Sequence, residues 1–255
     1  MNKTVALKPV ALKPVALLAA SLVAAVTGCT AGSSTPTPAA THKTVKLTIF
    51  AASSLTNAFS AEAAAFAQKT GDQTTFSFAG SQELVAQLRQ GAPADVVATA
   101  DLATMLNVPH GSGAKVFARN RLVIVTARGN PKHVTGLADL ARSDLVVVLA
   151  APSVPAGKYA AKALSAAHVT AHPKSLEDNV RGVLTKVLLG EADVGIVYAS
   201  DALSTKNVTA IRIPDSPIAS YPALAVRPEG QAFVDFLLSP QGQAILARYG
   251  FLPPR

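Results

Sequence analysis

Short apolar runs alternate with amphipathic segments in the first half of the chain, and this alternation restricts the fold more than any other feature. Runs typical of buried strands occupy residues 45–53, 74–80 and 94–100. Between them, residues 54–71 and 81–91 carry apolar side chains at helical spacing, and both segments end at a glycine, as many helices do. This order of strand, helix and strand predicts a parallel sheet covered by helices.

The second half repeats the pattern. Strands are expected at 121–127, 144–151 and 194–199, and helices at 155–167, 176–190, 230–239 and 239–250. A chain of 255 residues is long enough for two small lobes. We therefore predict an α/β protein with two lobes, each a mostly parallel sheet flanked by helices. Lobe 1 would comprise residues 44–124 and 213–255, and lobe 2 residues 125–212.

The amino terminus has the features of a secretory leader. Residues 1–14 contain three lysines and precede an apolar run that is too short to span a bilayer. The run ends in VTGC, which resembles the lipobox of bacterial lipoproteins. We predict a signal peptide over 1–28, lipidation of Cys29, a flexible tether over 29–43 and a location on the outer face of the cell membrane. A buried free thiol is the alternative for Cys29.

Composition and motifs disfavour other classes of function. Apolar residues make up 49% of the chain and charged residues 15%, as in folded proteins. The net charge is +8, of which the three lysines of the leader account for three, and the remaining charges are scattered. Tryptophan is absent, so nucleic-acid binding is not expected. The sequence lacks HExxH, GxSxG and GxxxxGK[ST]. A loop and a helix start account for the acidic candidates Asp95, Glu177 and Asp178, so we expect neither an enzyme nor a cofactor. His42 and His110 are expected to be solvated.

Two serines stand where predicted strands give way to helices. Ser54 follows the first strand and Ser81 follows the second. Ligands of parallel sheets bind at such junctions, because helix starts present unpaired backbone N–H groups and the positive end of the helix dipole. A plain helix N-cap is the alternative for each serine. The second half offers further donors, namely the amides of Ala156 and Gly157, the amides of Asn179 and Val180, and the hydroxyl of Tyr198.

Several strings in order resemble the molybdate-binding periplasmic proteins of ABC transporters, from about Val45 to Leu252. They are TIFAASSLTNAF, FAGSQELVAQLRQGAPADVVATAD, FARNRLVIV, VPAGKYAAKAL, EDNVRGVL, GIVYASDA and RYGF. The resemblance implies a two-lobed class II binding fold that closes on its ligand by hinge bending, which we expect near Ile124–Thr126 and Arg212. It also implies molybdate or tungstate as the ligand, an ABC importer permease as the partner, and a monomer.

The same resemblance implies five ligand donors. They are Ser54, Ser81, the amide of Ala156, the amide of Val180 and the hydroxyl of Tyr198, and molybdenum would be held only as the bound oxyanion. Two features depart from the family. Gly80 and Gln82 flank Ser81 where many relatives have serines, so a supporting hydroxyl is missing, and the segment around Asn107 to Lys115 is shortened.

Three alternatives remain open from sequence. The same fold could bind another tetrahedral oxyanion such as sulfate, and competition between anions would separate the two. An enzyme or a purely structural lipoprotein is less favoured, and neither would require a ligand that raises the protein's stability. Arg181, beside Val180, would either steer anions or be a solvated helix charge.

Overall fold

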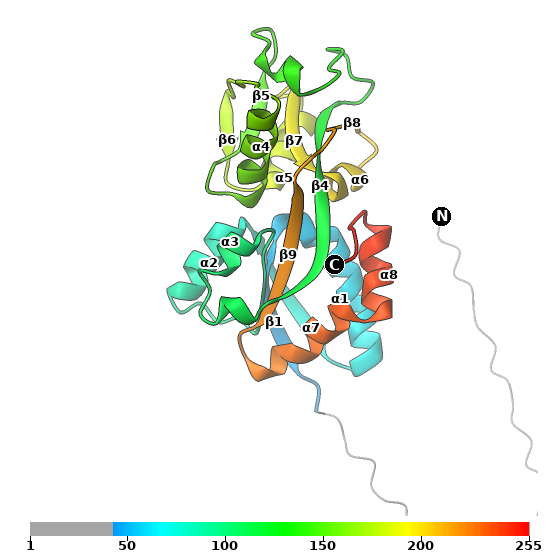
Figure 1. Ribbon diagram of the computed structural model, residues 1–255. Helices are drawn as coiled ribbons and strands as arrows, with labels where there is room; N and C mark the ends of the chain where they lie inside the picture. The colour runs from blue at the N-terminus through cyan, green and yellow to red at the C-terminus, as the bar shows by residue number, and fades with distance from the viewer. Residues whose placement is uncertain (1–42, 255) are drawn as a thin grey trace, which may run out of the picture. The chain divides into compact units, whose positions relative to one another are not determined.

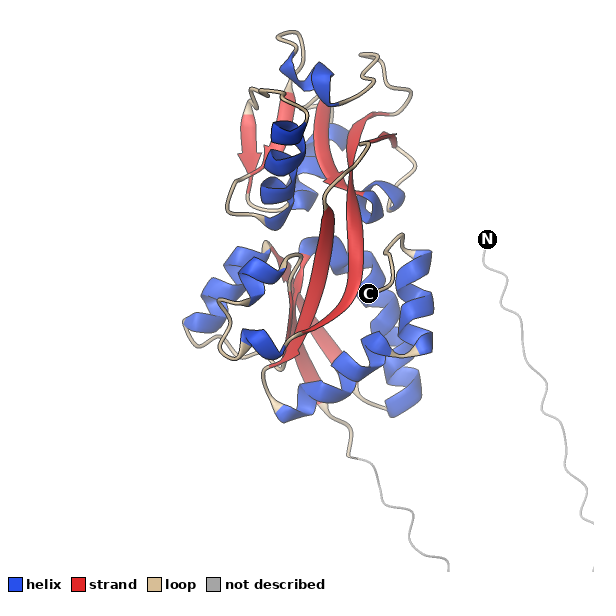
Figure 2. Ribbon diagram, in the orientation of Figure 1, coloured by secondary structure: helices blue, strands red, loops and turns tan. Residues whose placement is uncertain are grey.

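The computed structural model describes residues 43–254. The predicted signal peptide, Cys29 and nearly all of the predicted tether lie outside the described residues. The described part is a mixed α/β structure in which helices flank the strands (Figure 1, Figure 2). This confirms the predicted fold class.

We call the first group of strands and its helices lobe 1. Its sheet order is β2 (Gln73–Ala79), β1 (Lys46–Ala52), β3 (Val96–Ala98), β9 (Ile218–Ala225) and the first part of β4 (Lys115–Ala127). Strands β2, β1 and β3 are parallel, whereas β9 is antiparallel to β3 and β4. The helices of this lobe are α1 (Thr56–Thr70), α2 (Ser81–Arg89), α3 (Leu102–Met105), α7 (Gln231–Leu238) and α8 (Pro240–Arg248).

We call the second group lobe 2. Its strands are β5 (Val147–Ala150), β6 (Ser175–Glu177), β7 (Val194–Tyr198), β8 (Val208–Arg212) and the second part of β4. Strand β5 pairs in parallel with β6 and β7, and β4 is antiparallel to β7 and β8. The helices are α4 (Pro155–Ala166), α5 (Val180–Leu188) and α6 (Ala199–Leu203). Both sheets are therefore more mixed than predicted, because the strands that join the lobes run antiparallel to their neighbours.

Strand β4 belongs to both lobes (Figure 1). Its residues up to Arg121 pair with β9, and those from Leu122 onward pair with β7 and β8. The predicted boundary after Ile124 lies inside this strand. Residues 213–217 make the second connection, from β8 to β9.

One predicted helix begins later than expected, and strands β8 and β9 were not predicted. The segment 176–190 was predicted as one helix, but residues 175–177 form strand β6 and the helix begins only at Val180. The side chain of Asn179 caps it by accepting a hydrogen bond from Gly182 N at 3.0 Å. Strand β9 contains Pro222, which faces an irregularity in β4 between Val116 and Ala118, a position where sheets tolerate proline.

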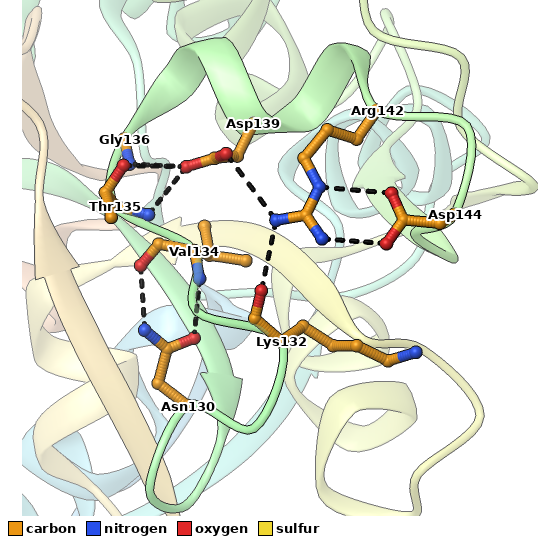
Figure 3. A network of polar contacts seen from close by, with 8 residues as sticks. All are labelled: Asn130, Lys132, Val134, Thr135, Gly136, Asp139, Arg142 and Asp144. Carbon is orange, nitrogen blue, oxygen red and sulfur yellow. Dashed lines mark hydrogen bonds and ion pairs between the residues drawn. The ribbon is translucent and has the colours of Figure 1, made fainter.

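A loop between β4 and β5 is held by its own polar contacts (Figure 3). Arg142 pairs with Asp144 at 2.7 Å, and Asn130 hydrogen-bonds both backbone groups of Val134. The carboxylate of Asp139 accepts hydrogen bonds from the backbone and hydroxyl of Thr135, which lower its pKa. These contacts satisfy the loop locally and do not involve the residues of the predicted site.

Candidate functional site

A pocket gathers residues of both lobes. The pocket is compact, and the space between its lining atoms, open solvent included, is about 190 Å³. Its lining consists of Ala52, Ser53, Ser54, Ala79, Gly80, Ser81, Ala100, Val154, Pro155, Ala156, Asn179, Val180 and Tyr198. The structure thus brings together all five residues that were predicted to bind an anion.

Three helices begin at this pocket. Helix α2 starts at Ser81, α4 at Pro155 and α5 at Val180. The first amides of a helix have no acceptor within that helix, so the N–H groups of Ser81, Ala156 and Val180 are suited to an external acceptor. Each helix also directs the positive end of its dipole toward the pocket. An anion would therefore meet a positive potential that does not depend on lysine or arginine.

The two serines are not plain N-caps. Ser54 lies in the 3-10 turn η1 (Ser53–Leu55), and Leu55 occupies the N-cap position of α1. Ser81 is the first residue of α2, whose N-cap is Gly80. The Oγ of Ser81 accepts a hydrogen bond from Ala100 N at 3.1 Å, which leaves its own hydrogen free to donate. Both serines are buried, with 3% and 2% exposure.

Tyr198 supplies a buried hydroxyl. It ends β7, its side chain is 1% exposed, and its hydroxyl lies beside that of Tyr221, with which it makes a side-chain hydrogen-bond contact. Burial raises the pKa of Tyr198 well above its usual range, so the hydroxyl keeps its proton and remains a donor. An anion in the pocket would offer this buried donor a charged acceptor.

Charged side chains are kept out of the lining. Arg181 follows Val180, but its Nε lies 2.9 Å from Oδ1 of the fully buried Asp201. Burial raises the pKa of Asp201 to about 6 against the lowering effect of Arg181. The Arg181 guanidinium is therefore ion-paired with Asp201 while its side chain is still 26% exposed, and anion steering by Arg181 stays a prediction.

Side chains of Gln82, Lys158 and Arg181 make polar contacts that join the lobes around the pocket, and we call them the interlobe contacts. Gln82 Nε2 donates to the carbonyl oxygen of Asp178 at 2.8 Å. Lys158 Nζ lies 2.9 Å from Asp101 Oδ2 and 2.9 Å from Thr104 Oγ1. Arg181 Nη2 donates to Asn57 Oδ1. Each of these residues lies within four positions of the pocket lining, so the elements that line the pocket also hold the lobes together.

Residues considered for other chemistry have structural partners elsewhere. Asp95 accepts a hydrogen bond from Thr48 N at 2.7 Å, and Glu177 pairs with Lys186 at 2.7 Å. His110 lies in a loop with a positive φ of 60° and does not line this pocket. Among residues 43–254, no group of metal-ligating side chains is large enough to suggest a metal centre.

One buried residue near the site was missed from sequence. Tyr221 on β9 is fully buried, and its hydroxyl lies 3.0 Å from Ser54 Oγ. Its ring also packs edge-on against Tyr198, with ring centroids 5.6 Å apart. No sequence signal marked it, because β9 itself was not predicted.

Comparisons with known proteins agree on one family. A family model described as bacterial extracellular solute-binding protein matches residues 47–252. The molybdate-binding protein ModA of Mycobacterium tuberculosis (strain ATCC 25618 / H37Rv) is 40% identical over 240 residues, which cover 89% of this chain and 92% of that protein.

Solved structures show the same fold. The Azotobacter vinelandii periplasmic molybdate-binding protein is 20% identical, with a TM-score of 0.67, over 82% of this chain and all of that one. The sulfate-binding protein SubI of Mycobacterium tuberculosis H37Rv is 22% identical, with a TM-score of 0.73, over 82% of this chain and 87% of that one.

Within the described residues, no helix is long and apolar enough to cross a membrane.

Proposed function

The chain belongs to the family of bacterial extracellular solute-binding proteins, and from that premise we propose that it captures molybdate for an ABC importer. The relatives are solute-binding proteins, so the proposed role is binding and delivery without catalysis or a cofactor. The 40% identity to a molybdate-binding protein over nearly the whole chain supports molybdate as the ligand.

One observation carries the proposal, namely a small pocket in which neutral donors converge from both lobes. Hydroxyls of Ser54, Ser81 and Tyr198 and amides of Ala156 and Val180 line it, and no lining residue carries a charge. A tetrahedral dianion accepts hydrogen bonds at all four oxygens, so a site made of donors suits it. Tungstate has the same shape and charge, and we expect it to bind as well.

Sulfate is the competing ligand, because SubI shares the fold. Selection between dianions would depend on size, since a smaller ion leaves some buried donors badly paired. A protonated anion such as hydrogenphosphate would bring its own donor to a site built of donors. We therefore expect discrimination against protonated anions to be stronger than discrimination against sulfate.

Capture would proceed by closure of the lobes. The anion would first meet the donors of one lobe, and bending in β4 and in residues 213–217 would bring up the donors of the other. The interlobe contacts would hold the closed state. The closed shape would then be what a permease recognises.

Gln82→Ala tests this role of the interlobe contacts. We expect molybdate to dissociate about fivefold faster, because loss of one hydrogen bond of roughly 1 kcal/mol destabilises only the closed state. Gln87→Ala, an exposed position on the same helix, is the control. Dissociation can be followed by rapid mixing with a molybdate chelator. Equal rates in both variants would show that Gln82 does not stabilise closure.

The predicted signal peptide indicates where in the cell the protein acts. We propose that the protein acts outside the cytoplasm as a monomer, tethered to the membrane by lipid on Cys29, which lies outside the described residues. Support comes from the VTGC tetrapeptide and from the extracellular family. Mass spectrometry of the membrane-bound protein would test the lipid, and Cys29→Ser should release it into the soluble fraction.

Thermal unfolding of the purified protein with each anion tests the ligand. A ligand present at about 100 times its Kd stabilises the folded state by about 2.7 kcal/mol. We expect the largest rise in midpoint with molybdate and tungstate, a small rise with sulfate and the smallest with phosphate. A rise with sulfate alone would retain the fold and replace the ligand. No rise with any anion would overturn the proposed function.

A further inference from the structure

Tyr221 lies directly behind the anion pocket. It comes from β9, is fully buried and does not belong to the pocket lining. Its hydroxyl and the Oγ of Ser54 are 3.0 Å apart, and the two residues are separated by 167 positions. The ring is held edge-on by Tyr198 and by Phe251, with centroid distances of 5.6 and 5.3 Å. The side chains of Asn120 and Tyr198 also hydrogen-bond the Tyr221 hydroxyl. The position of the hydroxyl is therefore set by packing and by polar contacts on several sides.

The direction of this hydrogen bond decides what Ser54 offers to the pocket. A serine hydroxyl has one hydrogen, and the two oxygens can share a hydrogen bond with either one as donor. If Ser54 donates to Tyr221, it presents only lone pairs to the pocket and repels an anion. If Tyr221 donates to Ser54, the Ser54 hydrogen is free for the anion.

We propose that Tyr221 is a positioning residue of the anion site, which donates its hydrogen to Ser54 and so commits the Ser54 hydroxyl to donate into the pocket. This rests on the proposed function, because the pocket must hold an oxyanion for the direction to matter. Ser81 is arranged in the same way, since its Oγ accepts from Ala100 N. Both serine hydroxyls thereby accept a hydrogen bond from the side away from the pocket and donate one into the pocket.

The arrangement also bears on selectivity. A serine hydroxyl without Tyr221 is free to rotate and to accept a hydrogen bond as well as donate one. Such a hydroxyl can accommodate a protonated anion, which the wild-type site would reject because donor would face donor. Tyr221 is thus expected to favour molybdate over hydrogenphosphate as well as to strengthen binding.

Tyr221→Phe is the direct test, because it removes one oxygen and keeps the ring contacts. We expect the Kd for molybdate to rise about fivefold to tenfold. We also expect the ratio of the Kd values for phosphate and molybdate to fall. Both constants are measured by calorimetry at neutral pH on the purified protein. Tyr249→Phe, which alters a half-buried tyrosine outside the pocket, is the matched control.

A double-mutant cycle with Ser54→Ala separates positioning from a general structural effect. If Tyr221 acts through Ser54, Tyr221→Phe should add less than about twofold to the Kd in the Ser54→Ala background. Equal effects in both backgrounds would overturn the proposal. So would an unchanged Kd and an unchanged anion ratio in Tyr221→Phe.

A second variant covers the case in which Tyr221→Phe does not fold. Ser54→Ala alone should lower the phosphate-to-molybdate ratio of Kd values, and an unchanged ratio would overturn the proposal. The fate of the proposed function is read separately from wild-type protein. Absence of molybdate binding there would reject the proposed function, whereas normal wild-type binding with a normal Tyr221→Phe variant would reject only this inference.

Discussion

A proline at position 180 is expected to weaken molybdate binding by about 10-fold to 100-fold, the range for losing a hydrogen bond to a charged group. Val180 is the first residue of α5. Proline is favoured at this position, because the N–H that it lacks has no partner in the helix. The preceding residue, Asn179, has φ −155° and ψ 164°, an extended conformation that suits a residue before proline. Val180→Pro therefore removes the donor and keeps the helix start.

The control for this substitution is Val180→Ala. The side chain of Val180 is 3% exposed, so both variants lose packing and some stability, but only proline loses the N–H group. Calorimetric titration with molybdate should show near-normal affinity for Val180→Ala and weak affinity for Val180→Pro. Similar affinities in the two variants would mean that the Val180 amide does not bind the anion.

The positions of the five predicted residues in one pocket could be anticipated because each depends on a local feature of the chain. Ser81 and Val180 stand where an apolar run gives way to helical spacing, and Tyr198 ends a run that reads as a strand. A helix start fixes where unpaired amides lie without knowledge of distant residues. The structure then brings these positions into one pocket, as strand order in an α/β fold requires.

Contacts between distant segments were not predictable in this way. Tyr221 contacts Ser54 only because β9 pairs with β3 and β4. Pro222 makes the sequence of β9 atypical of a strand. The ion pair between Arg181 and Asp201 was likewise not predictable, because the sequence pattern shows only a cation at the start of a helix. Such contacts depend on the packing of elements whose pairing the local pattern does not contain.

The structure gives a reason for the departure from the family pattern at Gly80 and Gln82. In the sequence, the departure indicated only that a hydroxyl next to Ser81 is missing. A Cβ at Gly80 would collide with the carbonyl oxygen of Asp178 and with the Gln82 amide, so glycine makes room for the contact between the lobes. The two substitutions therefore belong together, since a small residue at one position allows the longer side chain at the other to reach the opposite lobe.

Replacement of Glu62 by methionine is expected to stabilise the protein, and to do so more at high pH. Glu62 lies on the buried face of α1 between Phe59 and Phe66, with 0% exposure. Neither carboxyl oxygen has a hydrogen-bond partner among the described residues. Burial raises the pKa of Glu62 from 4.5 to about 8, although Arg248 opposes the shift.

The sign of the pH dependence follows from this shift. The folded state binds the Glu62 proton more tightly than the unfolded chain, so stability falls as pH rises from about 4.5 to about 8. Between pH 6 and pH 8 the loss from this group is roughly 2 kcal/mol. The buried Asp201, with a pKa of about 6, titrates mainly below that window.

Thermal unfolding of wild type and Glu62→Met at pH 6 and pH 8 measures the effect. Methionine has similar length, forms helices well and fills the apolar site without a charge. We expect the unfolding midpoint of the variant to exceed that of the wild type by several degrees more at pH 8 than at pH 6. A difference of about 1 kcal/mol corresponds to roughly 2–4 °C in a protein of this size. Glu191→Met, at an exposed position, should leave the pH dependence unchanged. If the unfolding midpoint of Glu62→Met depends on pH as strongly as that of the wild type, another group titrates in this range. The Glu62 carboxyl would then be protonated, or paired with another group, at both pH values.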